Sequence, residues 1–462
     1  MASTLLRRRY SNFLSRVSTG MGNPSSNSGA PYHYEQRRMC TLRSTPRTPL
    51  LVLPPVSNGG NLIYRFYNPA AERIESVSAP VKHGSDLLES EIVGSSHGWL
   101  ALFNLRNNSI VLSNPFTHRQ INLPPVHTLP DPEINLTDGR GRVSKVVLSC
   151  CPDEDEEGCR AVMSYGPGER LAFCRPRRCT EWSPMEDSFF DGYKEEIRDY
   201  GVDYARIYED FTYCPKREVF NCTTQFEVDL EDWSIAVPTQ FEVWDLLSDP
   251  HSFKSKTKSI YWHLIDIKGP KCPWIEENMD IVKTCRQIPY LVNDNHGDRD
   301  RLFLVIRFVI QRACINRPFA DVDSIPYDPV SDRLMVHLYP HKTIGFSVVE
   351  IHFETRPANG RINGLSRIVG GCGNSLDGLA MFIGMNHSFV VSSAADSGLK
   401  PNCIYFTDSN KHQVPLDSIY GGHDIGIFDY ENKTLSPCYY PCDVRSYRGI
   451  VPTPVWLTPS AH

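Results

Sequence analysis

Two stretches near the C-terminal end, PNCIYFTDSN and GGHDIGIFDY, contain the side chains best able to do chemistry. A thiol close to an imidazole could act as a nucleophile, and carboxylates beside the imidazole could help to bind a metal ion. The residues concerned are Cys403, Asp408, His423 and Asp424. Either they form a reactive site or they belong to the framework of a sheet.

Cys403 lies in the segment NCIYFTD, whose alternation places Ile404 and Phe406 on one face of a strand. A reactive cysteine needs a nearby base and a depressed pKa, and the sequence indicates neither. Because a free cysteine usually behaves as a small hydrophobic side chain, we predict that Cys403 is a buried structural thiol. We expect Asp408 and the next two residues, Ser and Asn, to form the turn that follows.

His423 and Asp424 are neighbours in the sequence, and neighbouring residues of a regular strand point to opposite faces. From such a strand they do not bind one metal ion together. The preceding Gly421 and Gly422 favour a turn in which Asp424 bonds the local backbone. We therefore interpret both stretches as framework.

A group of cysteines in the first half of the chain suggests a zinc site, because thiolates at the ends of hairpins can converge on one ion. The group consists of Cys150, Cys151, Cys159, Cys174 and Cys179. None of the spacings is CxxC, so we expect no structural zinc here or at Cys438 and Cys442. Fifteen cysteines in 462 residues are also well below the density of a disulfide scaffold, so we expect mostly reduced, buried thiols.

Residues 153–157 are five consecutive acids, which could bind a cation or a basic partner but more often form a solvated loop tip. The tryptophans are expected to pack in the core rather than to form a ligand cage. They are Trp99, Trp182, Trp233, Trp244, Trp262, Trp274 and Trp456. Neither a glycine loop ending in GK[ST] nor an HExxH motif occurs. From these residues we expect no catalytic, cofactor-binding or metal-binding site.

The net charge of −6 conceals a basic N-terminus. Residues 1–47 contain eight arginines, no lysine and one acid, Glu35. Taking these from the 48 basic and 54 acidic residues of the chain leaves 40 and 53, a net charge of −13 for the remainder. Because affinity for nucleic acid depends largely on neutralising phosphates, we expect no nucleic-acid partner.

The first residues, MASTLLRRRYSNFLSRVSTGMG, have the composition of an organellar transit peptide. Their apolar side chains recur on one face of a helix, and three arginines interrupt the apolar run of about 7 to 15 residues that a signal peptide needs. We predict import into the mitochondrion, with the chloroplast as an alternative. If the segment is only a basic tail, the chain stays in the cytosol or nucleus. The most apolar run elsewhere, LFLVIRFVI, contains Arg307 and is shorter than the roughly 18 residues of a membrane span, so we expect no span.

From about residue 49 onward the chain alternates short apolar runs with turn residues, which is typical of an all-β protein. One hairpin is predicted from residues 98–104 and 109–113, and another from residues 143–150 and 159–165, followed by a strand that ends at Pro176. A short helix is expected near residues 188–199. Residues 231–256 and 311–330 are interpreted as irregular.

The number and shortness of these strands leave a sandwich, a barrel or a propeller. Residues 49–460 are too many for one sandwich, whereas a propeller accommodates a chain of this length at about 40 to 50 residues per blade. We therefore predict a Kelch-like β-propeller of six or seven blades over residues 49–460. Residues 1–48 are predicted to be a disordered transit peptide and linker.

Seven segments, in order along the chain, resemble the plant KIB-type β-propeller family, which is catalogued as a domain of unknown function. They are SSHGWLAL, LSNPFTHRQINLPP, KVVLSCCP, RLAFCRP, NCIYFTD, GHDIGIFDYE and PTPVWLTP. The resemblance covers about residues 60–460 and implies a Kelch-like propeller from a higher plant. It supplies no catalytic residues.

Many members of that family carry an F-box before the propeller and are similar to substrate receptors of ubiquitin ligases. An F-box needs about 40 residues of Leu-rich helical sequence, and residues 1–50 instead offer the presequence and a Pro- and Ser-rich linker. The arrangement resembles the organelle-directed branch that lacks the F-box. We expect a non-catalytic protein-binding propeller that reaches the organelle through the import machinery, with the acidic tip and residues 272–285 in its binding surface.

The alternatives are an adaptor related to F-box/Kelch proteins and an enzyme that works in the central channel. Co-purification with a SKP-type adaptor would identify the first, and inward-facing acids or histidines with perturbed pKa values would indicate the second.

Overall fold

The structure is a computed structural model, and it describes twenty segments of the chain. These are residues 40–41, 48–58, 61–80, 90–104, 106–129, 143–166, 170–185, 205–227, 238–246, 256–264, 277–278, 285–296, 300–314, 319–321, 341–351, 375–392, 394, 396–408, 424–439 and 453–457. Almost all of this part is strand and turn, with one short 3-10 helix, η1 (Val126–Thr128). Among these residues no helix has the length and apolar character needed to cross a membrane.

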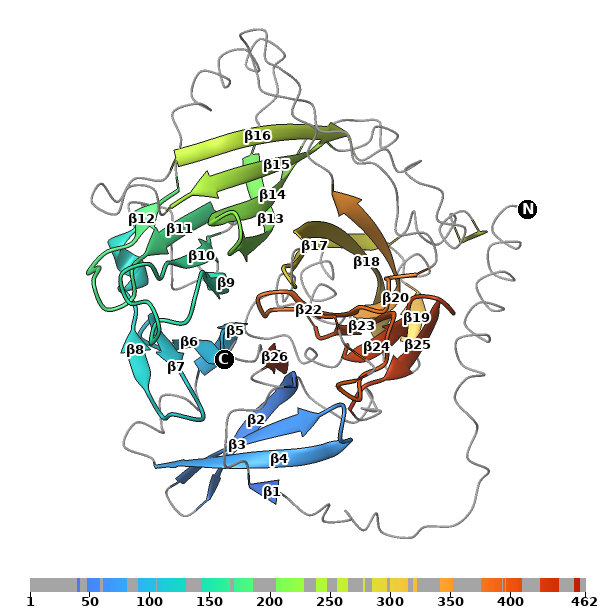
Figure 1. Ribbon diagram of the computed structural model, residues 1–462, viewed down its shortest axis with the longest axis horizontal. Helices are drawn as coiled ribbons and strands as arrows, with labels where there is room; N and C mark the ends of the chain where they lie inside the picture. The colour runs from blue at the N-terminus through green and yellow to red at the C-terminus, as the bar shows by residue number, and fades with distance from the viewer. Residues whose placement is uncertain are drawn as a thin grey trace, which may run out of the picture.

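Hydrogen bonding arranges the described strands in five sheets, which lie around a common centre (Figure 1). The first sheet, in spatial order, is β1 (Cys40–Thr41), β4 (Arg73–Pro80), β3 (Asn61–Asn68), β2 (Leu50–Asn58) and β26 (Val455–Leu457). The second is β5 (Ser90–Ser96), β6 (Trp99–Asn104), β7 (Ser109–Ser113) and β8 (Gln120–Asn122). The third is β9 (Val143–Leu148), β10 (Ala161–Tyr165), β11 (Arg170–Cys174) and β12 (Ser183–Pro184). The fourth is β13 (Ala205–Cys214), β14 (Val219–Glu227), β15 (Pro238–Asp245) and β16 (Lys256–Leu264).

The fifth sheet has nine strands and consists of two groups joined by a single parallel pair, Asn293 with Phe389. One group is β17 (Arg286–Asp294), β18 (Arg301–Cys314), β19 (Phe319–Asp321) and β20 (His341–Ile351). The other is β21 (Ala380–Ile383), β22 (Phe389–Val391), β23 (Cys403–Phe406), β24 (Gly426–Asp429) and β25 (Thr434–Pro437). Because this pair joins two groups of strands into one sheet, the number of sheets is not the number of blades. Six or seven blades stays a prediction.

The hydrophobic core lies between neighbouring sheets rather than within one layer, as expected when sheets pack face to face around an axis. Trp99 from β6 shares a buried cluster with Met163 from β10, and Phe173 from β11 shares another with Trp244 from β15. The ring closes where β26, from the C-terminal end, pairs antiparallel with β2 near the start of the described strands. This closure leaves fewer open sheet edges, and it confirms the prediction of an all-β propeller.

Turn chemistry explains why the strands are short. The Asn104 side chain accepts a hydrogen bond from the Arg106 backbone N–H at 2.8 Å, and Asn114 accepts one from Phe116 at 3.0 Å. Such Asx turns end one strand and start the next. The two predicted hairpins are confirmed, with strands at β6 and β7 and at β9 and β10. The predicted helix near residues 188–199 lies outside the described residues.

The interpretation of residues 231–256 and 311–330 as irregular was wrong. Strand β15 lies inside the first range, and the end of β18 together with β19 lies inside the second. Strand β15 was not recognised from the sequence because the strand contains Glu242, a charged residue that is fully buried. The Glu242 carboxylate accepts hydrogen bonds from the Tyr208 hydroxyl and the Trp244 indole N–H, both at 2.9 Å, which offset the cost of burying it.

Candidate functional site: the buried polar centre and the upper face

The innermost strands β5, β9, β13 and β17 run parallel to one another around the centre. Arg160, in the turn after β9, donates its Nε–H to Leu246 O at 3.1 Å; Leu246 follows β15, which runs parallel to β13, so β9 and β13 end on the same side. The other observation is a set of contacts between neighbouring strands, whose partners advance in the same direction along β5 and β9 and along β13 and β17. They are Leu148 N to Ser96 Oγ (3.2 Å), Lys145 Nζ to Asp210 Oδ1 (2.6 Å), Leu291 N to Asp210 Oδ2 (2.7 Å) and Asn293 Nδ2 to Tyr213 O (2.8 Å). Gly94 is needed in β5, because a Cβ atom there would lie 2.1 Å from the Val146 carbonyl oxygen.

Parallel inner strands end on the same side of the ring, so the turns that follow them emerge together. We call this side the upper face, and it carries residues 97–98, 149–160, 215–218, 295–296 and 300 among those described. The turn residues 106–108 follow β6, which is antiparallel to β5, and they lie on the opposite side.

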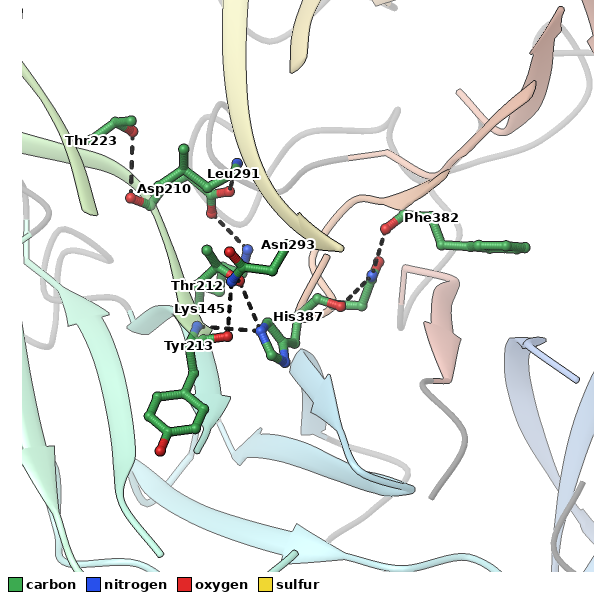
Figure 2. Close-up of polar contacts among 10 residues, drawn as sticks. Lys145, Asp210, Thr212, Tyr213, Thr223, Leu291, Asn293, Phe382 and His387 are labelled. Carbon is green, nitrogen blue, oxygen red and sulfur yellow. Dashed lines mark hydrogen bonds and ion pairs between the residues drawn. The ribbon is translucent and has the colours of Figure 1, made fainter. Parts of the chain in front are cut away.

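A buried ion pair joins β9 to β13 at the centre (Figure 2). The side chains of Lys145 and Asp210 are 2 % and 1 % exposed, and they are 2.6 Å apart. The second oxygen of Asp210 accepts the backbone N–H of Leu291 in β17. One carboxylate therefore connects three successive inner strands.

His387 extends this network to the segment that precedes β22 (Figure 2). Its Nε2 accepts a hydrogen bond from the Tyr213 backbone N–H at 3.4 Å and lies 2.9 Å from the Thr212 hydroxyl. The His387 backbone N–H donates to Ser95 in β5 at 2.8 Å. Because Nε2 acts as an acceptor, this geometry requires a neutral imidazole.

Burial keeps two histidines at the centre uncharged. The rings of His97 and His387 are 6.1 Å apart. Burial lowers the pKa of His97 to about 4, and hydrogen bonds to the backbone of Leu148 and Ser149 offset this only in part. Burial, together with the positive charges that His97 and Lys145 can carry, places the pKa of His387 well below its ordinary value.

We expect the protein to lose stability when the pH falls below about 6.5, the pKa of an unfolded histidine. In this range the histidines are protonated in the unfolded chain but remain neutral in the folded chain. The free energy of unfolding therefore decreases as the pH falls toward about 4. His97 alone accounts for about 3 kcal/mol over this range, from its shift to about 4. Lys145 is the charged side chain that acts on His387, besides His97 itself, and the backbone of Leu148 and Ser149 faces His97. Urea unfolding at pH 7.5 and pH 5 measures the loss.

The control for this pH dependence is His387→Gln, which removes one titrating group and retains a hydrogen-bond acceptor near Thr212. Its stability should vary less with pH than that of the natural chain. Equal pH dependence in both proteins would contradict the assignment to the histidines.

A second buried cluster surrounds Arg307 in β18, which is fully buried. Its guanidinium lies 2.6 Å from Asp424 Oδ2 and donates to the Thr407 carbonyl at 2.7 Å. Asp424 also accepts hydrogen bonds from the backbone and the hydroxyl of Thr343 in β20, at 2.9 and 2.7 Å. Although burial alone would lower the pKa of Arg307, the Asp424 carboxylate raises it above its ordinary value.

We expected Asp424 to bond the local backbone, whereas the structure gives it distant partners. Its partners lie 81 and 117 positions away in the sequence, and it joins the two groups of the fifth sheet. Asp408 is 1 % exposed and adds to the negative charge near Arg307. The residues that follow Asp408, and His423, lie outside the described residues.

Cys403 is 2 % exposed, and burial raises its pKa to about 11, which confirms a buried structural thiol. The predicted alternation is also confirmed, because Ile404 and Phe406 share one cluster while Cys403 and Tyr405 share another. The charged groups that act on the Cys403 thiol are Asp429, Lys400 and Glu431, rather than the carboxylates of the Arg307 cluster. No reactive pair forms around it in the described part of the chain.

One motif with the spacing of a nucleophile elbow, GxSxG, was missed from the sequence. It is GSSHG, from Gly94 to Gly98. A nucleophile elbow is a turn between a strand and a helix, whereas this segment is the hairpin between β5 and β6. Ser96 is 2 % exposed and its hydroxyl accepts the Leu148 N–H, so it contributes to packing between strands.

The five cysteines from residues 150 to 179 all border one hydrophobic cluster. Among the residues that the structure describes, no group of three or more His, Cys, Asp or Glu side chains has the arrangement of a metal site. The ten cysteines whose side chains are described are free; seven are buried, and Cys150, Cys179 and Cys285 are partly exposed. The second cysteine of the pair near the C-terminus, Cys442, lies outside the described residues.

Residues 153–157 are exposed, as predicted for a loop tip, and arginines contact three of these five acids. The contacts, which we call the arginine–acid patch, join Asp153 to Arg119 (2.8 Å) and Arg177 (3.0 Å), Glu156 to Arg178 (3.2 Å), and Glu157 to Arg178 (2.6 Å) and Arg175 (3.4 Å). Since Arg119 follows β7, the patch bridges the second and third sheets. The loop therefore presents paired arginines and acids rather than an isolated acidic surface for a cation or a basic partner.

The tryptophans whose side chains are described, Trp99, Trp182, Trp244 and Trp456, are at most 3 % exposed, which confirms their packing role. The side chains of the other three lie outside the described residues. So does most of residues 272–285, of which only residues 277–278 and 285 are described.

The model of the KIB1-4 beta-propeller family matches residues 66–429, from within β3 to the end of β24. A search of curated proteins finds no match.

Proposed function

Because the chain belongs to the KIB1-4 β-propeller family, we propose that it is a non-catalytic protein-interaction module that is imported into an organelle and binds a protein partner through its upper face. The mitochondrion is the proposed organelle. The proposal keeps the division into a transit peptide and linker over residues 1–48 and a propeller over residues 49–460.

The arginine–acid patch is the observation that supports binding at the upper face. Its charges are exposed at the loop tips yet held in place by contacts between two sheets, as in the pair Arg119 and Asp153. A similar ion pair, Arg217 with Asp300 at 3.1 Å, ties two further upper loops together. Interfaces are enriched in arginine, and charges that are already positioned lose less entropy on binding.

The charge distribution supports the partner class and the proposed import. With a net charge of −13 outside residues 1–47, the chain repels phosphate backbones, so a protein is the better partner. The arginines of residues 1–47 are the feature that an import receptor would recognise.

Catalysis at the centre is the competing function, and the lowered pKa values of His97 and His387 are the observation that favours it. A catalytic group must reach the proton that it moves. His387 instead uses Nε2 for contacts within the ring, and it is 9 % exposed. These contacts therefore support a role in holding the inner strands together more than a role in binding a substrate.

The test is affinity purification of the tagged full chain from the mitochondrial fraction of a cell that expresses it. We expect the chain to be protected there from added protease and to capture a specific protein. Arg178→Glu should reduce the capture about tenfold, because a charge at a binding centre is worth about 1 kcal/mol or more. Arg178 is half exposed, so the variant should fold.

The matched control is Arg106→Glu, the same substitution in an exposed turn on the opposite side of the ring. It should leave the capture unchanged. Equal loss in both variants would contradict binding through the upper face. Recovery in the cytosol with a SKP-type adaptor would contradict the import and favour an adaptor of a ubiquitin ligase.

A further inference from the structure

Two cysteines face each other at the base of the loop between β9 and β10. The register of these strands pairs Leu148 with Ala161. It continues beyond the strands, since the Ser149 N–H donates to the Arg160 carbonyl at 2.9 Å. The next opposed residues are therefore Cys150 and Cys159.

Contacts of the sulfur atoms agree with this register. The Cys159 thiol donates to the Cys150 carbonyl oxygen at 3.4 Å, and the Cys150 thiol donates to Asp155 O at 3.8 Å. Ser149 and Arg160 form the hydrogen-bonded position, so Cys150 and Cys159 occupy the non-hydrogen-bonded position that follows. There, opposed Cα atoms are about 4.5 Å apart, within the range of a disulfide.

The two thiols differ in exposure, as in pairs that oxidise in two steps. Cys150 is partly exposed, whereas Cys159 is fully buried. A hydrogen bond from the Cys159 thiol lowers the pKa of Cys150, and the same contact, with burial, raises the pKa of Cys159. The reachable sulfur is thus the one that forms a thiolate more readily.

We propose that Cys150 and Cys159 form a redox-active dithiol, with Cys150 as the site of peroxide attack and Cys159 as the resolving thiol. The proposal does not depend on the proposed function, because it concerns chemistry within one hairpin. It is a modification site on the upper face, at the base of the arginine–acid patch.

The reaction balances with a peroxide as the oxidant. The Cys150 thiolate attacks one peroxide oxygen, the O–O bond breaks, and the released hydroxide takes a proton to become water. The product is a sulfenic acid on Cys150. The Cys159 sulfur then attacks Cys150, the S–O bond breaks, and the Cys159 proton leaves with the hydroxide as a second water. Two thiols are oxidised to one disulfide, and one peroxide is reduced to two waters.

The experiment treats the reduced full chain with hydrogen peroxide and maps disulfides by mass spectrometry. Trypsin leaves Cys150, Cys151 and Cys159 in one peptide, so a second cleavage at the acids between them is needed to assign the bond. We expect a disulfide between Cys150 and Cys159. In Cys150→Ser, oxidation of Cys159 should slow by about tenfold or more, because a buried thiol is a poor nucleophile.

Cys179→Ser is the matched control, since Cys179 is also partly exposed and borders the same hydrophobic cluster. It should oxidise like the natural chain. In Cys159→Ala, we expect the sulfenic acid on Cys150 to persist and to be trapped by a 1,3-diketone. Thermal unfolding of each variant shows whether it is folded, and Cys150→Ser tests the proposal even if Cys159→Ala does not fold.

A disulfide between Cys150 and Cys151, or between Cys174 and Cys179, would overturn the proposal. So would thiols that stay free in peroxide, or equal oxidation rates in the natural chain and Cys150→Ser.

Discussion

Replacing Asp210 with asparagine is expected to destabilise the protein by about 3 to 5 kcal/mol, the usual cost of leaving a buried charge unpaired. Lys145 is 2 % exposed, and Asp210 is the carboxylate that it contacts at 2.6 Å. The substitution also weakens the bond to the Leu291 N–H and so loosens three inner strands at once. Urea unfolding of Asp210→Asn and the natural chain at pH 7.5 measures the difference.

Glu156→Gln is the control for this substitution, because it removes a similar charge from an exposed ion pair. Exposed pairs contribute about 1 kcal/mol or less, so this variant should unfold close to the natural chain. If both variants unfold alike, the central ion pair does not hold the ring together.

The second large effect is expected for Asp424→Asn, again about 3 to 5 kcal/mol, because it leaves the fully buried Arg307 without its carboxylate. Asp424 also receives two hydrogen bonds from Thr343, so the loss should loosen the contact between β20 and the segment before β24. Hydrogen exchange of the β20 amides, together with urea unfolding, measures both consequences.

Glu350→Gln is the matched comparison for Asp424→Asn. Glu350 lies in β20 and pairs with Arg301 of β18 at 2.8 Å, but both side chains are 20 % exposed. Because water partly solvates this ion pair, Glu350→Gln should lower the free energy of unfolding by only about 1 kcal/mol. A larger loss for Glu350→Gln than for Asp424→Asn would contradict the ranking by burial.

Much of the fold was predictable from the sequence, because strand length and turn chemistry are local. The alternation in NCIYFTD correctly placed Ile404 and Phe406 on one face, and the hairpin predicted from residues 98–104 and 109–113 is found as β6 and β7. Strand β15 escaped notice because Glu242, a charged residue in the strand, bonds Tyr208 from another strand, and that partner is not visible locally.

The buried ion pairs of Lys145 and of Arg307 were not predictable either, because their partners are distant in the sequence. Asp210 is 65 positions from Lys145, and Asp424 is 117 positions from Arg307, so no spacing in the sequence relates them. A fully buried arginine and lysine are also the opposite of what residue type alone indicates. The pattern GSSHG could have drawn attention to the end of β5, where Ser96 and His97 lie, but it would have suggested a nucleophile rather than a contact between strands.

We propose that the polar side chains at the centre stabilise the ring rather than do chemistry. A double-mutant cycle tests it directly, by comparing Lys145→Met, Asp210→Leu and the double variant in urea unfolding. We predict that each single variant loses about 3 kcal/mol or more and that the double variant recovers most of this, because no charge is then left unpaired. Single variants as stable as the natural chain would contradict the claim.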